Sequence, residues 1–459
     1  MINSKQIEQF KTEFRGQIIQ KSDAEYENAC KVYNGMIHKQ PLLFAYCTDV
    51  SDVINAVKFG RENNLLIAVR GGGHNAGGLG TCDDGLVIDL SKIRYTRVDT
   101  KNKTVRVGGG CTWGDVDHAT YQFGMVTPSG IISTTGVGGL TLGGGLGHLT
   151  RRFGLSIDNL LEADVVLADG KFVTASSEEN QDLFWAIRGG GGNFGIVTSF
   201  LFKLHPLKYF MAGPTFYEIE KTASVMHFFD DFIKTAPEEI NGFFAFMIVP
   251  PVPLFPDSLH LKNVCAIVWT YTGTEDKAEE ILAPIKKFGP PLLFGIQPMP
   301  YPAMQSLFDA LYPPGLQWYW RADFVNELSD KAIEKHIKFG SNLPTMFSSM
   351  HIYPVNGMAS RIKNSDTAWN YRNTRYSQVI VGVDPDPANK DKITSWTKQY
   401  YDAVHPFSAG GAYVNFMMEE GEDRVRASYN GNYKRLTEIK KKYDPHNVFK
   451  VNQNIKPSA

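Results

Sequence analysis

Cysteine is scarce in this 459-residue sequence, and long apolar runs are absent from it. The five cysteines, Cys30, Cys47, Cys82, Cys111 and Cys265, form no C-x-x-C pair, so the sequence indicates neither a zinc site nor a disulfide framework. No window approaches the roughly 18 apolar residues that a membrane-spanning helix needs, and the first residues lack the apolar core of a signal peptide. These absences predict a cytoplasmic protein that holds no metal and does not enter a membrane.

Neither positive nor negative charge is in excess. The sequence has 47 lysines and arginines against 48 aspartates and glutamates, for a formal net charge of −1, and it contains no long basic run. We therefore expect neither nucleic acid nor an anionic membrane as a partner. The length predicts two or three compact units.

Glycine is abundant, with 43 residues, and it is concentrated between Gly71 and Gly195 in clusters at 70–80, 136–147 and 188–195. Glycine lets backbone N–H groups approach an anion closely, so the clusters predict a site for a phosphate-bearing ligand such as a pyrophosphate. Two alternatives remain open: tight turns between packed strands, or a nicotinamide-binding loop. The second fits poorly, because the third cluster follows a predicted helix and precedes a predicted strand, the reverse of the required order.

Hydrophobic periodicity and turn signals place the main elements. Ser51 is expected to cap one helix, and Ser176 or Ser177 to begin another that ends at Ile187. Beyond residue 206 the glycine runs disappear and aromatic residues increase, which predicts a second domain. The predicted strands include 65–69, 86–90, 105–107 and 195–202, and the predicted helices include 221–235, 274–288, 329–340, 387–404 and 433–442.

His74 lies inside the first glycine cluster, between Gly73 and Asn75. A lone histidine is more often a surface or core residue than a functional one. In a loop with exposed backbone, however, its imidazole projects toward whatever the loop binds. The chemistry of the residues alone leads no further.

Longer motifs give the glycine clusters a context. The segment 70–75, R-G-G-G-H-N, resembles the phosphate-binding loop of FAD-linked oxidases with a flavin domain of the vanillyl-alcohol-oxidase/PCMH type. Taken in order, the motifs resemble the berberine-bridge-enzyme-like branch of these proteins over nearly the whole chain. The other motifs are G-V-G-G at 136–139, G-G-G-L-G at 143–147, R-F-G-L at 152–155 with Asp158 and Asn159 after it, L-F-W-A-I-R-G-G-G at 183–191, N-F-G at 193–195, Y-V-N-F at 413–416 and Y-D-P-H-N-V-F at 443–449.

The resemblance implies an α+β fold: a PCMH-type FAD-binding domain plus an inserted substrate-binding domain with an antiparallel sheet and flanking helices. We place the FAD-binding domain at 1–207, the substrate-binding domain at 208–410, and a C-terminal segment that returns to the FAD-binding domain at 411–459. The resemblance also implies FAD bonded covalently through its 8α-methyl group to His74. Many members add a bond from a cysteine to flavin C6, but Ile132 stands at that position, so we expect a single histidyl link.

The residues expected to contact FAD follow from the same resemblance. They are Arg70, Gly71, Gly72, Gly73, His74, Asn75, Thr134, Thr135, Gly136, Gly138, Gly139, Gly143, Gly144, Gly147, Asn159, Gly195, Ile196, Val197, Tyr413 and Asn415.

The two catalytic bases familiar in the family are both missing from the sequence. Phe416 stands where a tyrosine usually ends a Y-x-N-Y segment, and Arg361 aligns with an alternative glutamate. On a predicted strand Tyr319 and Arg321 share one face, where the guanidinium would favour a phenolate. Tyr319 is therefore the expected substitute base, unless it only packs. Further candidates are Tyr413, Tyr429 and His148.

The expected function is oxidation of an alcohol, sugar or secondary metabolite by hydride transfer to the flavin. The expected electron acceptor is O₂, which gives H₂O₂. A flavin dehydrogenase with poor O₂ reactivity is one alternative. A flavin-binding protein without turnover is another, because Phe416 removes the usual base.

Overall fold

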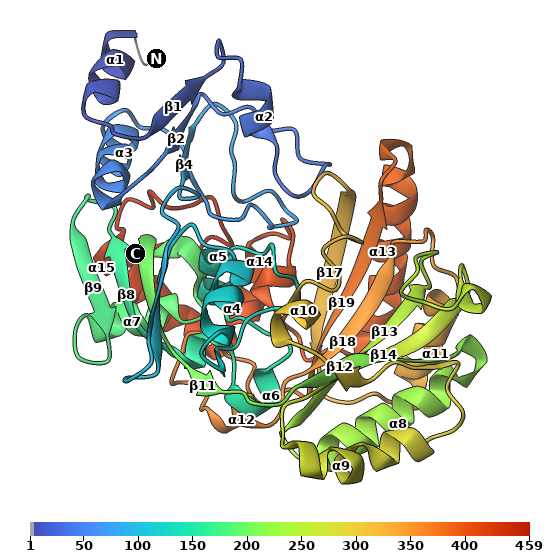
Figure 1. The fold of residues 1–459 in the computed structure, drawn as a ribbon. Helices are drawn as coiled ribbons and strands as arrows, with labels where there is room; N and C mark the ends of the chain where they lie inside the picture. Colours follow the sequence, from blue (N-terminus) through green and yellow to red (C-terminus); the bar gives the residue numbers. More distant parts are fainter. Residues whose placement is uncertain (1–3) are drawn as a thin grey trace.

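The computed structural model describes residues 4–459. Helix α1 (Ser4–Thr12) comes first and is followed by a small mixed sheet (Figure 1). The strand order is β1 (Gln17–Gln20), β2 (Leu43–Tyr46), β4 (Leu86–Asp89), β3 (Ile67–Arg70), in which β2 and β3 both pair parallel to β4. Helix α3 (Val50–Glu62) follows β2, and its N-cap is Asp49, whose side chain accepts from the Asp52 backbone N–H. The prediction that Ser51 caps this helix is wrong, because the carboxylate two residues earlier makes that bond.

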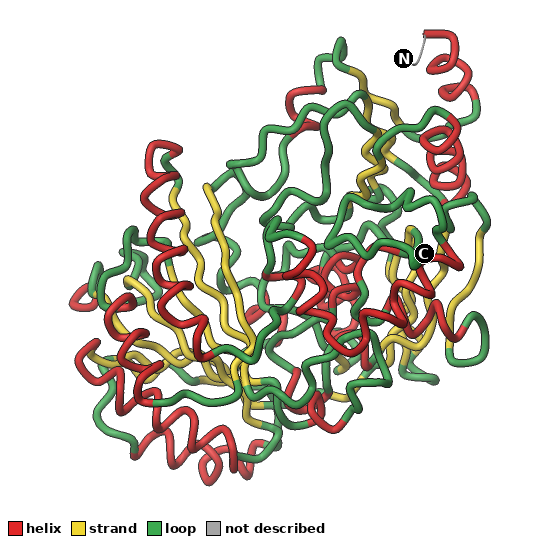
Figure 2. Tube along the Cα trace, turned by 180° about the vertical axis from the view of Figure 1, so that it is seen from behind, coloured by secondary structure: helices red, strands yellow, loops and turns green. Residues whose placement is uncertain are grey.

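A five-stranded antiparallel sheet follows, in the order β5 (Thr96–Asp99), β6 (Thr104–Gly108), β10 (Ile196–Lys203), β8 (Leu160–Val166), β9 (Phe172–Ser176). Helix α7 (Gln181–Ile187) begins later than predicted, because Ser176 ends β9 and its hydroxyl accepts from the backbone N–H groups of Glu178 and Glu179. The C-terminal helix α15 (Tyr433–Tyr443) packs against α7, so the end of the chain lies beside this sheet (Figure 2).

The third sheet has eight strands, all antiparallel to their neighbours. The order is β15 (Leu293–Phe294), β12 (Met211–Glu218), β14 (Asn263–Tyr271), β13 (Ile240–Ile248), β18 (Ser349–Pro354), β19 (Tyr376–Asp384), β17 (Gln317–Val325), with β16 (Gln297–Pro298) also paired to β12. The helices α8 (Thr222–Thr235), α9 (Glu275–Lys287), α11 (Asp330–Gly340) and α13 (Lys390–Val404) flank this sheet (Figure 1). The predicted fold class, α+β with an antiparallel sheet and flanking helices, is confirmed. No helix in residues 4–459 is both long and apolar enough to cross a membrane.

Side chains along the eight-stranded sheet alternate between two buried faces. Phe244 and Ile352 point toward the flanking helices and belong to one apolar core. Their neighbours Phe243 and Tyr353 point the other way and belong to the core that joins this sheet to the glycine-rich part of the chain. The functional site lies on this second face.

Candidate functional site

A cavity of about 360 Å³ lies between the glycine-rich segments and the second face of the eight-stranded sheet. A single buried water needs roughly 10–15 Å³ on the same measure, so the cavity has room for a large ligand. It extends from the loop after β3 to side chains of β13, β17, β18 and β19. One ligand-sized space therefore connects the predicted phosphate loop with the eight-stranded sheet.

The glycine-rich end of the cavity has the features of an anion cradle. The backbone N–H groups of Gly72, Gly73 and His74 donate to no acceptor within the described residues. A Cβ on Gly72 would lie 2.5 Å from the Gly136 backbone nitrogen. The two segments can therefore pack this closely only because both positions are glycine. Gly139 also lines the cavity, but a Cβ there would meet no protein atom within 4 Å. Protein packing therefore does not explain why this residue is a glycine, whereas close contact between a ligand and the backbone does.

Two glycine substitutions should separate packing from ligand contact. In Gly139→Ala we expect the thermal unfolding temperature of the flavin-free protein to stay unchanged and FAD occupancy to fall, because the methyl group enters only the cavity. In Gly72→Ala we expect the flavin-free protein itself to lose stability, because the new Cβ meets backbone at 2.5 Å. Calorimetry and the flavin-to-protein absorbance ratio measure the two effects. Equal FAD occupancy in wild type and Gly139→Ala would contradict the assignment.

The second glycine cluster is not a continuous loop, because residues Val137–Gly143 form helix α5. Gly143, Gly144 and Gly147, predicted to contact FAD, are absent from the cavity wall. A Cβ on Gly143 would collide with the Asn415 amide, one on Gly144 would lie 2.9 Å from the Trp369 ring, and one on Gly147 would meet backbone carbonyls. These three glycines serve close packing, so their predicted cofactor contact is corrected.

His74 faces the cavity and is held in one orientation. Its ring stacks on Tyr33 with 3.9 Å between centroids, and its Nε2 lies 3.1 Å from the Thr134 hydroxyl. Burial lowers the pKa of His74 to about 4, so the imidazole is neutral at physiological pH. With Nε2 engaged, Nδ1 is the nitrogen available for a bond to a ligand. Ile132 lines the same cavity, and no cysteine does within the described residues.

Arg70 supports the loop from behind. Its Nε lies 2.5 Å from Asp89, and its other nitrogens donate to the Ala29 carbonyl at 2.7 Å and to the Tyr46 hydroxyl at 3.0 Å. The guanidinium charge is thus matched inside the protein. Anion binding by the loop would rely on backbone N–H groups.

Two further residues that were predicted to contact FAD, Thr134 and Asn159, do not line the cavity. Thr134 touches His74 but does not line the cavity, and Asn159 is a structural residue that donates to the Phe153 and Leu155 carbonyls and lies 2.6 Å from His205 Nε2. The predicted contact of Asn159 with FAD is corrected accordingly. The residues placed on the cavity wall are Arg70, Gly71, Gly72, Gly73, His74, Asn75, Thr135, Gly136, Gly138, Gly139, Gly195, Ile196, Val197, Tyr413 and Asn415.

Tyr319 and Arg321 do share a face of β17, but it is the face turned away from the cavity. The Arg321 guanidinium lies 4.9 Å from the Tyr319 ring centre, and Lys398 of α13 lies over the same ring. Trp318 and Trp320, on the opposite face, line the cavity instead. The prediction that Tyr319 is the catalytic base is therefore wrong.

Arg361 and His148 also lie outside the main cavity. Arg361 is an exposed residue that forms an ion pair with Glu238, so the alignment that put it at a catalytic position is wrong. His148 borders a separate small pocket, and burial lowers its pKa to about 3. Tyr429 does line the main cavity, on the glycine-rich side.

Tyr413 lines the cavity, but its phenol oxygen is already occupied. It accepts from the Gly145 backbone N–H at 2.8 Å and from the Asn415 amide at 2.8 Å. Both lone pairs are thus used, and burial raises the pKa of Tyr413. Its role is to fasten the segment after α5 to residues 413–415, so the structure does not favour Tyr413 as a base.

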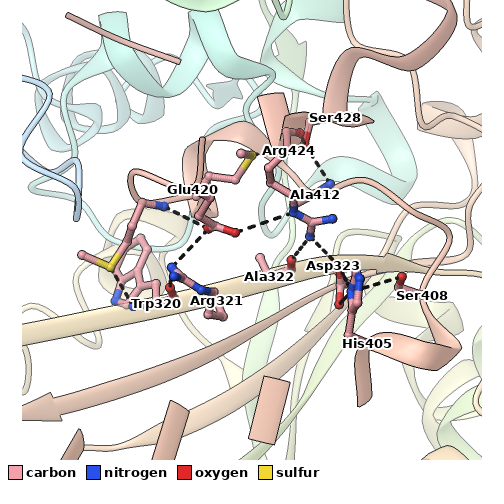
Figure 3. A network of polar contacts seen from close by, with 12 residues as sticks. Trp320, Arg321, Ala322, Asp323, His405, Ser408, Ala412, Glu420, Arg424 and Ser428 are labelled. Carbon is pink, nitrogen blue, oxygen red and sulfur yellow. Dashed lines mark hydrogen bonds and ion pairs between the residues drawn. The ribbon is translucent and has the colours of Figure 1, made fainter. Parts of the chain in front are cut away.

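A buried network of charges ties β17 to Glu420 and Arg424, which follow Phe416 in the chain (Figure 3). The Glu420 carboxylate lies between Arg321, at 3.5 Å, and Arg424, at 3.6 Å. Arg424 also reaches Asp323 at 2.5 Å, and the Asp323 side chain is fully buried. The outward-facing residues of β17 therefore position the cavity-facing ones and the Phe416 segment.

The structure adds a polar group that the sequence analysis missed. Ser349, His351 and Tyr353 alternate along β18 and all face the cavity. The Tyr353 hydroxyl lies 2.7 Å from His351 Nδ1, and the Ser349 hydroxyl lies 3.1 Å from His351 Nε2. Their spacing of two residues was the available signal, since it places all three on one face of a strand.

The chain is similar to known FAD-linked proteins. A family described as "FAD binding domain" matches residues 41–176, and one described as "Berberine and berberine like" matches residues 412–456. An FAD-linked oxidoreductase of Dictyostelium discoideum is 33% identical over 456 residues, which cover 98% of this chain and 97% of that protein. The (R)-6-hydroxynicotine oxidase of Paenarthrobacter nicotinovorans is 37% identical over 193 residues, 42% of each chain. The structure of wild-type BBE-like 1 from Physcomitrella patens is similar with a TM-score of 0.88 at 25% identity, and the match covers 99% of both chains.

Proposed function

Because the chain belongs to the berberine-bridge-enzyme-like family of FAD-linked oxidoreductases, we propose that it oxidises a small-molecule substrate with a covalently bound FAD and passes the electrons to O₂. The proposed covalent link is a single bond from His74. The observation that carries the proposal is the one cavity that joins the glycine cradle and His74 to the polar row on β18. Bound FAD supplies the acceptor for a hydride, that is, for two electrons and a proton.

The residues of the cavity have separate tasks in this proposal. Gly72, Gly73 and Gly139 allow the backbone to approach the phosphates. His74 would hold the cofactor, and Thr134 keeps the imidazole oriented through Nε2. Ile132 offers no thiol for a second bond, so flavin attachment stops at one link.

O₂ is the proposed electron acceptor, and H₂O₂ the product, because a relative that is 37% identical over 42% of the chain is named an oxidase. A dehydrogenase with poor O₂ reactivity is the competing function. A protein without turnover is disfavoured, because the polar row on β18 supplies proton-accepting groups beside Phe416.

The proposed oxidase activity is tested by reducing the holoprotein without air and then admitting O₂. We expect an active substrate to bleach the flavin absorbance, and air to restore it within seconds with one H₂O₂ formed per flavin. Photoreduced holoprotein serves as the control for reoxidation. Recovery over minutes in air, with rapid recovery by a dye acceptor, would make the protein a dehydrogenase.

A further inference from the structure

The half of the cavity under the eight-stranded sheet is almost entirely apolar. Its walls come from alternate residues of β13, β17 and β19, such as Phe243, Trp318 and Val381. Within the described residues the cavity wall has no lysine and no carboxylate, and its one arginine, Arg70, is paired with Asp89. A sugar needs several hydrogen-bonding partners and a charged ligand needs an opposite charge, because burying unpaired polar groups costs free energy. The walls therefore suit a neutral, largely apolar ligand.

The polar exception is the Tyr353, His351 and Ser349 row. Tyr353 lies beside Phe416, with 5.7 Å between ring centres, so it places a phenol next to the position where Phe416 lacks one. Its hydroxyl donates to His351 Nδ1 at 2.7 Å when Nε2 carries the imidazole proton and faces Ser349. A phenol with such a partner can take up a proton while it gives away its own.

We propose that Tyr353 and His351 together accept the hydroxyl proton of a neutral, largely apolar alcohol while the hydrogen on its carbon leaves as a hydride. This inference rests on the proposed function. The substrate O–H bond breaks and its proton joins the Tyr353 oxygen, while the phenolic proton of Tyr353 moves to His351 Nδ1. The substrate C–H bond breaks and its electron pair leaves with the hydrogen to FAD. The alcohol becomes a carbonyl compound and gives up two electrons, for which bound FAD would be the acceptor.

The two side chains need each other for this step. Burial raises the pKa of Tyr353 well above its usual value, so the phenol keeps its proton and cannot act as a preformed phenolate. Burial also lowers the pKa of His351 to about 4, which leaves the imidazole neutral and able to accept. Two other titratable groups lie near the row: Tyr312, which lines the same cavity, and His148, which borders the small pocket that Tyr353 also lines. No charged side chain of the described cavity wall competes for the proton.

Variants of the holoenzyme test the proton acceptor, with benzyl alcohol as the probe and stopped-flow flavin reduction as the measurement. We expect Tyr353→Phe and His351→Gln each to slow flavin reduction by about 10² or more, with FAD content unchanged. The matched control is Tyr400→Phe, which breaks a Tyr400–His336 contact of 2.8 Å outside the cavity and should leave the rate unchanged. We also expect the double variant Tyr353→Phe/Phe416→Tyr to recover part of the rate.

The pH profile distinguishes proton acceptance from packing. In wild type the rate of flavin reduction should fall as the pH drops through about 4, because His351 then carries a proton and cannot accept another. The His351→Gln variant should lack this fall. A Tyr353→Phe rate within about threefold of wild type, or a His351→Gln profile with the same acid limb, would overturn the assignment.

The substrate class is tested with matched probes. We expect benzyl alcohol and naphthalenemethanol to bleach the flavin at least about tenfold faster than hydroxymethylbenzoate, which adds one charge to the same ring, and than glucose. Dithionite bleaching shows that the flavin is present and reducible. Flavin reduction by glucose alone, or by neither aromatic alcohol in protein that dithionite bleaches, would overturn the inference. Protein that contains no flavin would instead contradict the proposed function.

Discussion

Replacing His74 with alanine should convert a protein that keeps its flavin through acid denaturation into one that releases all of it. The side chain faces the cavity, is neutral because burial lowers its pKa to about 4, and has its Nε2 engaged by Thr134. A neutral, oriented imidazole with a free Nδ1 is the nucleophile that covalent attachment needs. The measurement is flavin fluorescence in the washed acid pellet.

A matched control isolates the bond from the orientation of the ring. Thr134→Val removes the 3.1 Å contact to Nε2 but leaves the imidazole, so its acid pellet should still contain flavin, though attachment should be slower. A His74→Ala pellet as fluorescent as that of wild type would show that another residue carries the flavin.

Arg424→Met should lower the free energy of unfolding by about 3–5 kcal/mol, because it leaves buried carboxylates without their partner. Arg424 lies 2.5 Å from Asp323 and 3.6 Å from Glu420, and its side chain is 11% exposed while that of Asp323 is 0% exposed (Figure 3). After the substitution, the partly exposed His405 is the one ionic partner that Asp323 retains among residues 4–459. Urea unfolding followed by tryptophan fluorescence measures the loss.

The same helix, α14 (Glu422–Tyr429), offers the control. Arg426 forms a 3.6 Å ion pair with Glu422, but both side chains are well exposed. Solvent screens exposed ion pairs, so they contribute little to stability, and Arg426→Met should leave the unfolding curve nearly unchanged. Equal losses for Arg424→Met and Arg426→Met would mean that the buried network does not hold the Phe416 segment in place.

Regular elements with clear periodicity were predictable from the sequence. The predicted helix 221–235 is α8 (Thr222–Thr235), and the predicted helix 329–340 is α11 (Asp330–Gly340). Helix α5 was not predictable, because its sequence V-G-G-L-T-L-G has low helix propensity and its conformation comes from packing against distant segments.

The wrong prediction for Tyr319 shows what the alternation of side chains along a strand does not determine. Alternation predicts that Tyr319 and Arg321 share a face of the strand, and they do. It does not say which face turns toward the cavity, and both faces of β17 carry aromatic residues. The decision comes from α13, which covers the Tyr319 face.

The other differences between the sequence predictions and the structure result from contacts between residues far apart in the chain. Asn159 is occupied by His205 and by nearby carbonyls, so its side chain does not reach the cavity. The Ser349, His351 and Tyr353 row resembles an ordinary half-exposed strand in sequence. It becomes a candidate site only because β18 lies in the middle of the sheet that covers the cavity.

The mass of the purified wild-type chain under denaturing conditions tests most directly whether the cavity holds FAD bonded to His74. We expect the chain to be heavier by one FAD, and proteolysis to give one flavin-bearing peptide that contains His74 and no cysteine. A chain of unmodified mass, with all flavin free in the acid supernatant, would contradict the account.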